Sequence, residues 1–205
     1  MRLDGSCQCG KVRFRVDSTT PYPYMLCYCS ICRKTSGAVT SNVMGRRDTL
    51  EVTGKRHLRC HHAIVRNPGR RPVRSRGERW FCGRCGTHLY VLDDRWPEGV
   101  WPNAAALDTP LPVPPEYVQI MTRYRPRWVP AADTGPRHPE YPPLSIAAWH
   151  ERHGLTIDGE RAAKSVTGRS ARRTPRTNRG APTGGRKRAR RPRAPARRRR
   201  RSTAS

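Results

Sequence analysis

The chain has 205 residues, 35% of them hydrophobic, and a formal net charge of +27 at pH 7. That length fits one domain of ordinary size with extensions, and no apolar stretch is long enough to predict a membrane span. Residues 1–10 contain no apolar run, so we expect no secretory signal and a cytoplasmic location. Eight cysteines in such a chain indicate metal ligation or redox chemistry rather than a disulfide framework.

Short strands dominate the prediction for the first 130 residues. Val12, Phe14 and Val16 alternate with charged residues, which indicates a strand over 11–16 with one buried face. Further strands are expected at 49–53, 89–92, 100–101 and 117–121. The basic stretch 66–77 contains two prolines and two glycines and is interpreted as an exposed loop. Many short strands with almost no helical periodicity predict a mainly β fold.

One short helix is expected near the end of the patterned sequence. Ser145 can cap a helix over 146–153, and Gly154 can end it. Pro142 and Pro143 stop the helix from extending toward the N-terminus.

Positive charge is concentrated after this helix. Residues 161–205 contain 18 of the 42 Lys and Arg residues and no Asp or Glu, and they include five consecutive arginines at 197–201. No hydrophobic pattern remains after about Glu160, so this segment lacks apolar surface to offset the entropy of ordering it. We therefore predict a disordered, Arg-rich tail over 160–205.

Seven of the cysteines lie in three closely spaced groups: Cys7 with Cys9, Cys27 with Cys29 and Cys32, and Cys82 with Cys85. Structural zinc prefers four ligands in a tetrahedron, and two short pairs far apart in sequence commonly supply them. The first and third groups together form such a set. The triplet can hold a second zinc with one coordination position left for another ligand, which is the pattern of catalytic zinc.

Spacing alone leaves three alternatives open. The triplet could be completed as a closed structural site by one of four nearby side chains, His57, Cys60, His61 or His62. Two cysteines of the triplet could instead join Cys82 and Cys85. Cys29 and Cys32 also fit a dithiol redox motif, although no βαβ pattern surrounds them.

The three cysteine motifs resemble those of the glutathione-dependent formaldehyde-activating enzyme (GFA) family, which includes the centromere protein V group. Residues 5–14 are similar to the opening motif, 27–33 to the second motif and 81–87 to the third. Residues 107–108, 112–115 and 127–128 resemble the end of the domain, and 143–155 resemble an extension seen in some members. On this basis we expect a zinc-binding β domain over 1–130, an extension with a short helix over 131–159, and the tail over 160–205.

The resemblance implies a β-tent, a small fold of short antiparallel sheets, with two zinc ions per chain. It implies a structural zinc on Cys7, Cys9, Cys82 and Cys85, and an open, catalytic zinc on Cys27, Cys29 and Cys32. The implied activity is that of a carbon–sulfur lyase, the reversible joining of glutathione and formaldehyde to give S-hydroxymethylglutathione. The expected substrate is a glutathione or other thiol adduct of formaldehyde or a related aldehyde.

Three features depart from the family pattern. Tyr28 stands where His is common, the stretch 66–77 is unusually basic, and Cys60, His61 and His62 lie outside the motifs. The alternative interpretation is a non-catalytic zinc-binding protein whose tail binds nucleic acid. A run of arginines binds phosphates through counterion release, largely without sequence preference.

Overall fold

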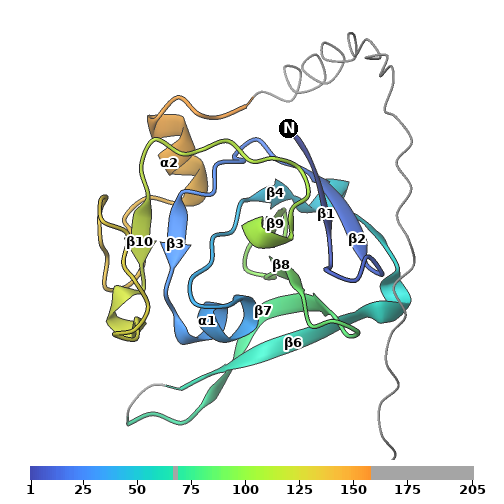
Figure 1. The fold of residues 1–205 in the computed structure, drawn as a ribbon, viewed down its shortest axis with the longest axis horizontal. Coiled ribbons are helices and arrows are strands. Elements are labelled where there is room, and N and C mark those ends of the chain that lie inside the picture. Colours follow the sequence, from blue (N-terminus) through green and yellow to red (C-terminus); the bar gives the residue numbers. More distant parts are fainter. Residues whose placement is uncertain (67–68, 158–205) are drawn as a thin grey trace, which may run out of the picture. The chain divides into compact units, whose positions relative to one another are not determined.

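A computed structural model describes residues 1–66 and 69–157, which form ten strands and two short α-helices (Figure 1). The predicted tail lies outside these residues. A three-stranded antiparallel sheet, in the order β1-β2-β5, is made of β1 (Arg2–Ser6), β2 (Arg13–Asp17) and β5 (Glu51–Thr53). Val12, Phe14 and Val16 are buried while Arg13 and Arg15 are exposed, which confirms the predicted one-sided strand.

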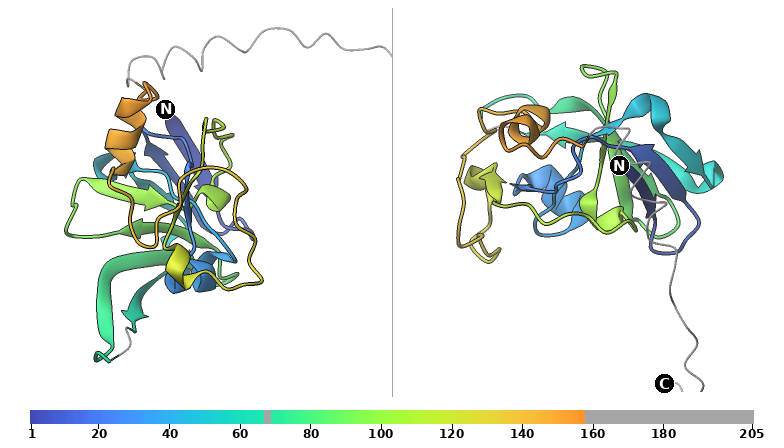
Figure 2. Two further views of the ribbon diagram at one scale, coloured as in Figure 1. Left: turned by 90° about the vertical axis from the view of Figure 1, so that its left-hand side faces the viewer. Right: turned by 90° about the horizontal axis from the view of Figure 1, so that it is seen from above.

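A five-stranded antiparallel sheet forms the second part of the fold. Its order is β4-β9-β8-β7-β6, with β4 (Gly45–Arg46), β9 (Gly99–Pro102), β8 (His88–Leu92), β7 (Val73–Cys82) and β6 (Leu58–Val65). Strands β6 and β7 form a long hairpin that extends beyond the other strands (Figures 1 and 2). The loop predicted over 66–77 is wrong in its second half, because 73–77 pairs into β7 despite its arginines.

A two-stranded sheet differs from the expected antiparallel pattern. Strands β3 (Met25–Cys27) and β10 (Val118–Ile120) are parallel, with Cys27 opposite Ile120. A helix that the sequence analysis missed, α1 (Ser30–Ser36), follows β3 directly. The predicted helix is confirmed as α2 (Ile146–Arg152), and the Ser145 side chain accepts a hydrogen bond from the backbone amide of Ala148. Neither helix of the described residues is long and apolar enough to cross a membrane.

Helix α2 packs against the two-stranded sheet through aromatic side chains. Tyr24 and Trp149 are stacked with ring centroids 3.7 Å apart, and both are buried with Val118 and Ile120. The buried His150 accepts a hydrogen bond from the backbone amide of Tyr22. The segment after residue 130 is therefore part of the packing that supports β3, the strand that carries Cys27.

We expect Trp149→Ala to lower the free energy of unfolding by about 3–5 kcal/mol, because it removes a large buried side chain and leaves a cavity. Chemical denaturation of the full chain measures this change. The matched control is Trp128→Ala, since Trp128 is 70% exposed and its loss should change the free energy of unfolding by less than about 0.5 kcal/mol. Equal effects of the two substitutions would contradict this description of the core.

Candidate metal centres

The structure brings together four cysteines from two segments that are distant in sequence. The sulfur atoms of Cys7, Cys9, Cys82 and Cys85 all lie within 4.8 Å of one another. The Sγ–Sγ distance is 3.5 Å between Cys7 and Cys9 and 3.8 Å between Cys9 and Cys82. Four thiolates around zinc, each about 2.3 Å from it, would be about 3.8 Å apart, so this group fits a tetrahedral metal ion.

Each half of this four-cysteine cluster is a tight turn stabilised by backbone hydrogen bonds. The amide of Gly10 bonds to the carbonyl of Cys7, and the amide of Gly86 bonds to the carbonyl of Cys82. Both glycines have a positive φ, 68° and 76°, which a residue with a side chain rarely adopts. The turns therefore aim both sulfurs of each pair at one point and leave Cys7 and Cys82 buried in the main core.

Thr87 ties the two turns to each other. Its hydroxyl oxygen accepts a hydrogen bond from the amide of Gln8 and lies 3.2 Å from the sulfur of Cys85. This contact with the hydroxyl, and a further one with the backbone of Thr87, lower the pKa of Cys85 to about 5. A thiol that ionises so readily is suited to bind a cation.

A second cluster is built where β3 passes into α1. The sulfur atoms of Cys27, Cys29 and Cys32 lie within 4.8 Å of one another. Cys27 ends β3, and its amide donates a hydrogen bond to the carbonyl of Thr40. Cys29 is the N-cap of α1, and its sulfur accepts a hydrogen bond from the amide of Cys32 at 3.3 Å. The short helix thus fixes the relative positions of two of the three sulfurs.

The three thiols of this triplet compete for one negative charge. Hydrogen bonds from Cys27 and Cys32 lower the pKa of Cys29 to about 2. The same contact with Cys29 raises the pKa of Cys27 to about 12, and hydrogen bonds to Cys27 and Cys29 raise the pKa of Cys32. Only a cation among the sulfurs would allow all three to ionise together, so the chemistry of this donor set also fits a metal ion.

The other candidate ligands named from the sequence are not part of either cluster. Among residues 1–66 and 69–157, the triplet group includes no histidine, no carboxylate and no further cysteine. Cys60 and His61 are exposed on β6, and His62 Nδ1 lies 3.0 Å from the carbonyl of Ser75 on the neighbouring strand. The nitrogen of His57 accepts a hydrogen bond from Arg56.

A buried histidine that the sequence analysis missed connects α1 to the five-stranded sheet. His88, on β8, has its Nδ1 atom 2.9 Å from the hydroxyl of Ser36, the last residue of α1. Burial and the charge of Arg79 lower the pKa of His88 to about 4, so its ring is neutral at physiological pH. In the sequence, the position of His88 directly after the third cysteine motif could have indicated that it lies near the clusters. This contact links the helix of the triplet to the strand that leaves the four-cysteine cluster.

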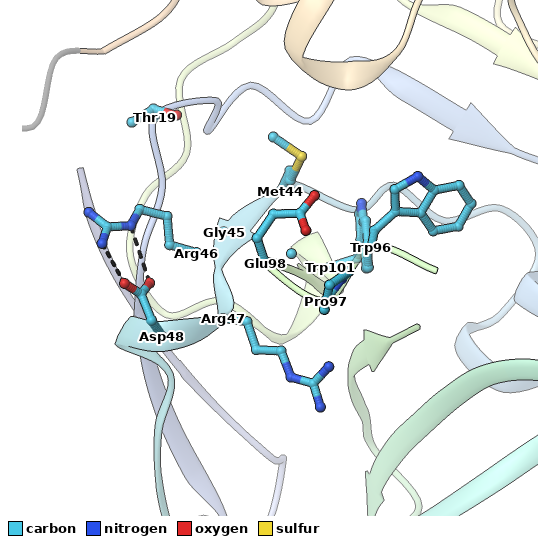
Figure 3. A pocket seen from close by; sticks show the side chains of 11 residues that line it. Thr19, Met44, Gly45, Arg46, Arg47, Asp48, Trp96, Pro97, Glu98 and Trp101 are labelled. Atoms are coloured by element: carbon cyan, nitrogen blue, oxygen red, sulfur yellow. Dashed lines mark hydrogen bonds and ion pairs between the residues drawn. The ribbon is translucent and has the colours of Figure 1, made fainter. Parts of the chain in front are cut away.

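One pocket lies apart from the cysteines, at the β4 edge of the five-stranded sheet (Figure 3). Its volume is about 560 Å³, and its walls include the indole rings of Trp96 and Trp101, which meet edge to face at 5.8 Å. Arg46 is paired with Asp48 there, and the side chains of Arg47 and Glu98 also line the pocket. The pocket therefore combines apolar walls with charges of both signs.

The fold and the two cysteine clusters define the class of this protein, a mainly β domain with two candidate metal centres. Comparisons with known proteins assign its family. The sequence model described as "Glutathione-dependent formaldehyde-activating enzyme" matches residues 2–123. A Halomonas elongata protein named "Putative glutathione-dependent formaldehyde-activating enzyme" is 47% identical over 159 residues, which are 76% of this chain and 98% of that protein. The chain belongs to the glutathione-dependent formaldehyde-activating enzyme family.

The crystal structure of a Rhodobacter sphaeroides protein aligns with 53% of this chain and 91% of that chain, at 27% identity and a TM-score of 0.41. A similarity this small does not bear on the fold.

Proposed function

We propose that this chain is a zinc-dependent carbon–sulfur lyase that reversibly joins glutathione, or another thiol, to formaldehyde or a related aldehyde. The observation that carries the proposal is the separation of a three-cysteine cluster from a complete four-cysteine cluster, in a chain of the GFA family. Three protein ligands leave one position of a tetrahedral ion for a reactant, which is how catalytic zinc differs from structural zinc.

The two clusters would then have different roles. Cys7, Cys9, Cys82 and Cys85 would hold a structural zinc between the start of the chain and the β7–β8 turn. Cys27, Cys29 and Cys32 would hold the catalytic zinc. The eight cysteines all lie within the described residues and form no disulfide there, which fits the reducing environment of the cytoplasm, where we place the protein.

The reaction needs a thiolate and a carbonyl carbon held in contact. The thiol sulfur attacks the aldehyde carbon, a C–S bond forms as the C=O π bond breaks, and the thiol proton ends on the new hydroxyl oxygen. Zinc bound by the triplet would lower the pKa of a thiol and orient it. Three thiolate ligands are already negatively charged, so thiol activation and positioning are favoured over strong polarisation of the carbonyl. The short turn from β3 into α1 holds these ligands in place.

The proposal is tested by loading the full chain with zinc and measuring the rate of S-hydroxymethylglutathione formation by exchange NMR, against the uncatalysed rate. We expect acceleration that is lost when zinc is removed by a chelator and returns with added zinc. A chain with two zinc ions bound that leaves the rate at its uncatalysed value with formaldehyde and related aldehydes would contradict the proposal.

A further inference from the structure

Positive charge in the described part of the chain is concentrated on one structural element. Residues 55–66 and 69–84, here called the basic hairpin, comprise the turn before β6, the strands β6 and β7, and the first residues after β7. They contain ten Lys and Arg residues and one acidic residue, Glu78. The rest of residues 1–160 contains 14 basic and 14 acidic residues, so the basic hairpin carries the whole excess of +9.

These charges are exposed and have no carboxylate partner. Nine of the ten basic side chains are exposed, and Arg79 is half-buried. Within the part of the chain that the structure describes, six arginines form salt bridges with Asp or Glu, and none of them belongs to the basic hairpin. The carboxylate of Glu78 accepts a hydrogen bond from the indole of Trp80 at 3.1 Å. The positive charge of the basic hairpin is therefore left for a partner outside the chain to neutralise.

Three segments meet at the base of the basic hairpin. Gly54 lies against Lys11, because a Cβ atom on Gly54 would be 1.9 Å from the Lys11 carbonyl oxygen. The amide of His57 donates to the carbonyl of Gly54, and the amide of Gly83 donates to the carbonyl of His57 at 2.7 Å. A Cβ atom on Gly83 would lie 2.8 Å from Cγ of Arg59. The segments around these residues therefore pack against one another.

Four cations gather near His57 where these segments meet. The Nε atom of Arg56 donates a hydrogen bond to His57 Nε2 at 3.0 Å, and Nη1 of Arg59 donates to two backbone carbonyls, each at 2.8 Å. Burial and then the charges of four neighbours lower the pKa of His57: Arg56, Arg84, Lys11 and Arg59. A guanidinium has five N–H donors, so Arg56 and Arg59 are held in place and still keep donors for an anion.

The other half of the basic hairpin is a two-stranded ribbon. Strand β8 pairs with β7 only from Glu78 onward, and β6 is the edge strand of its sheet, so residues 73–77 pair with β6 alone. This ribbon extends beyond the other strands (Figures 1 and 2). It carries Arg74 and Arg76, and Arg70 and Arg71 come just before it. The ten residues of β7 span about 33 Å, close to the length of one turn of a DNA duplex, about 34 Å.

We propose that the basic hairpin binds the phosphate backbone of duplex DNA. The inference does not depend on the proposed lyase activity. Nine of the ten cations are arginines, whose planar guanidinium can bond two phosphate oxygens at once. Cations at the base and on the ribbon lie about one helical turn apart, which fits a regular row of phosphates better than a short acidic peptide. Such binding releases counterions, so it depends steeply on salt and little on base sequence.

The test measures binding of the full, zinc-loaded chain to a duplex of about 20 base pairs between about 50 and 200 mM salt. Fluorescence anisotropy gives the slope of log Kd against log salt concentration. A ribbon variant removes four charges: Arg70→Gln, Arg71→Gln, Arg74→Gln and Arg76→Gln. A base variant removes two: Arg56→Gln and Arg84→Gln. The matched control removes four exposed arginines outside the basic hairpin: Arg2→Gln, Arg127→Gln, Arg137→Gln and Arg152→Gln.

Each phosphate contact contributes about one to the slope, so the ribbon variant should lower it by about three to four and the base variant by about two. At about 100 mM salt, Kd of the ribbon variant should rise at least about tenfold. The control loses the same net charge as the ribbon variant and should change the slope by less than about one. The Arg-rich tail is present in every chain, so its contribution is the same throughout.

Equal slopes for the ribbon variant and the control overturn the inference, because binding would then follow net charge or the tail. Displacement of the duplex by polyglutamate as readily as by unlabelled duplex, at equal charge concentration, also overturns it, since the partner would then be an acidic protein. Circular dichroism and zinc content check that each variant is folded. If the base variant unfolds, the ribbon variant decides the test alone.

Discussion

Cys82→Ser is expected to remove one zinc ion per chain and to abolish cooperative folding of the domain. Cys82 is fully buried in the main core, and its sulfur is 3.8 Å from that of Cys9, more than 70 positions earlier in the chain. Binding of a structural zinc contributes about 10–16 kcal/mol, whereas a domain of this kind is stable by about 5–15 kcal/mol in total. Loss of this one ligand therefore exceeds what the remaining core can offset.

The measurement is zinc content by mass spectrometry together with thermal unfolding. Cys60→Ser is the matched control, because Cys60 is exposed and belongs to neither cluster. It should retain two zinc ions and the wild-type unfolding temperature. A folded Cys82→Ser chain with wild-type stability would show that the four-cysteine cluster does not hold the domain together.

Cys29→Ser is expected to have a different outcome, in which the chain loses one zinc ion but keeps its fold. Lyase turnover should fall at least about a thousandfold, because the lost ion would contribute several kcal/mol of transition-state stabilisation. The fold should survive because serine is a good N-cap, and Ser at position 29 can replace the hydrogen bond that Cys29 now accepts from the amide of Cys32. Packing of β3 against β10 and α2 does not involve the Cys29 side chain within the described core.

Circular dichroism, zinc content and turnover should be measured on the same preparation of Cys29→Ser. Unfolding of this variant would make the triplet a structural site, and wild-type turnover with one zinc ion would remove the triplet from the chemistry. Cys60→Ser again serves as the control and should keep full turnover.

Features that depend on local sequence were predictable. The alternation of Val12, Phe14 and Val16 gave a strand that is buried on one face, and Ser145 marked the start of α2. The three local cysteine groups followed from short spacings, because residues one to three positions apart on a turn can point at one ion. The division into four and three cysteines was implied by the family resemblance, since spacing alone left other partitions open. The assignment of the metal ligands stays a prediction until an ion is observed.

Features that depend on contacts between distant residues were not predictable. Helix α1 is only seven residues long and has no buried residue, so no apolar period marks it. The parallel pairing of β3 with β10 joins segments about 90 residues apart and leaves no local pattern. The strand over 73–77 was not predicted, because its arginines made the segment resemble an exposed loop. In the structure this segment belongs to β7, which pairs with β6 in a long hairpin.

The seven cysteines are expected to form two metal sites with different coordination. The most direct test is a crystal structure of the zinc-loaded chain with anomalous data at the zinc edge. We expect two peaks per chain, one among Cys7, Cys9, Cys82 and Cys85, and one beside Cys27, Cys29 and Cys32 whose fourth ligand is solvent or substrate. A single peak, or a triplet zinc closed by His57, Cys60, His61 or His62, would contradict this account.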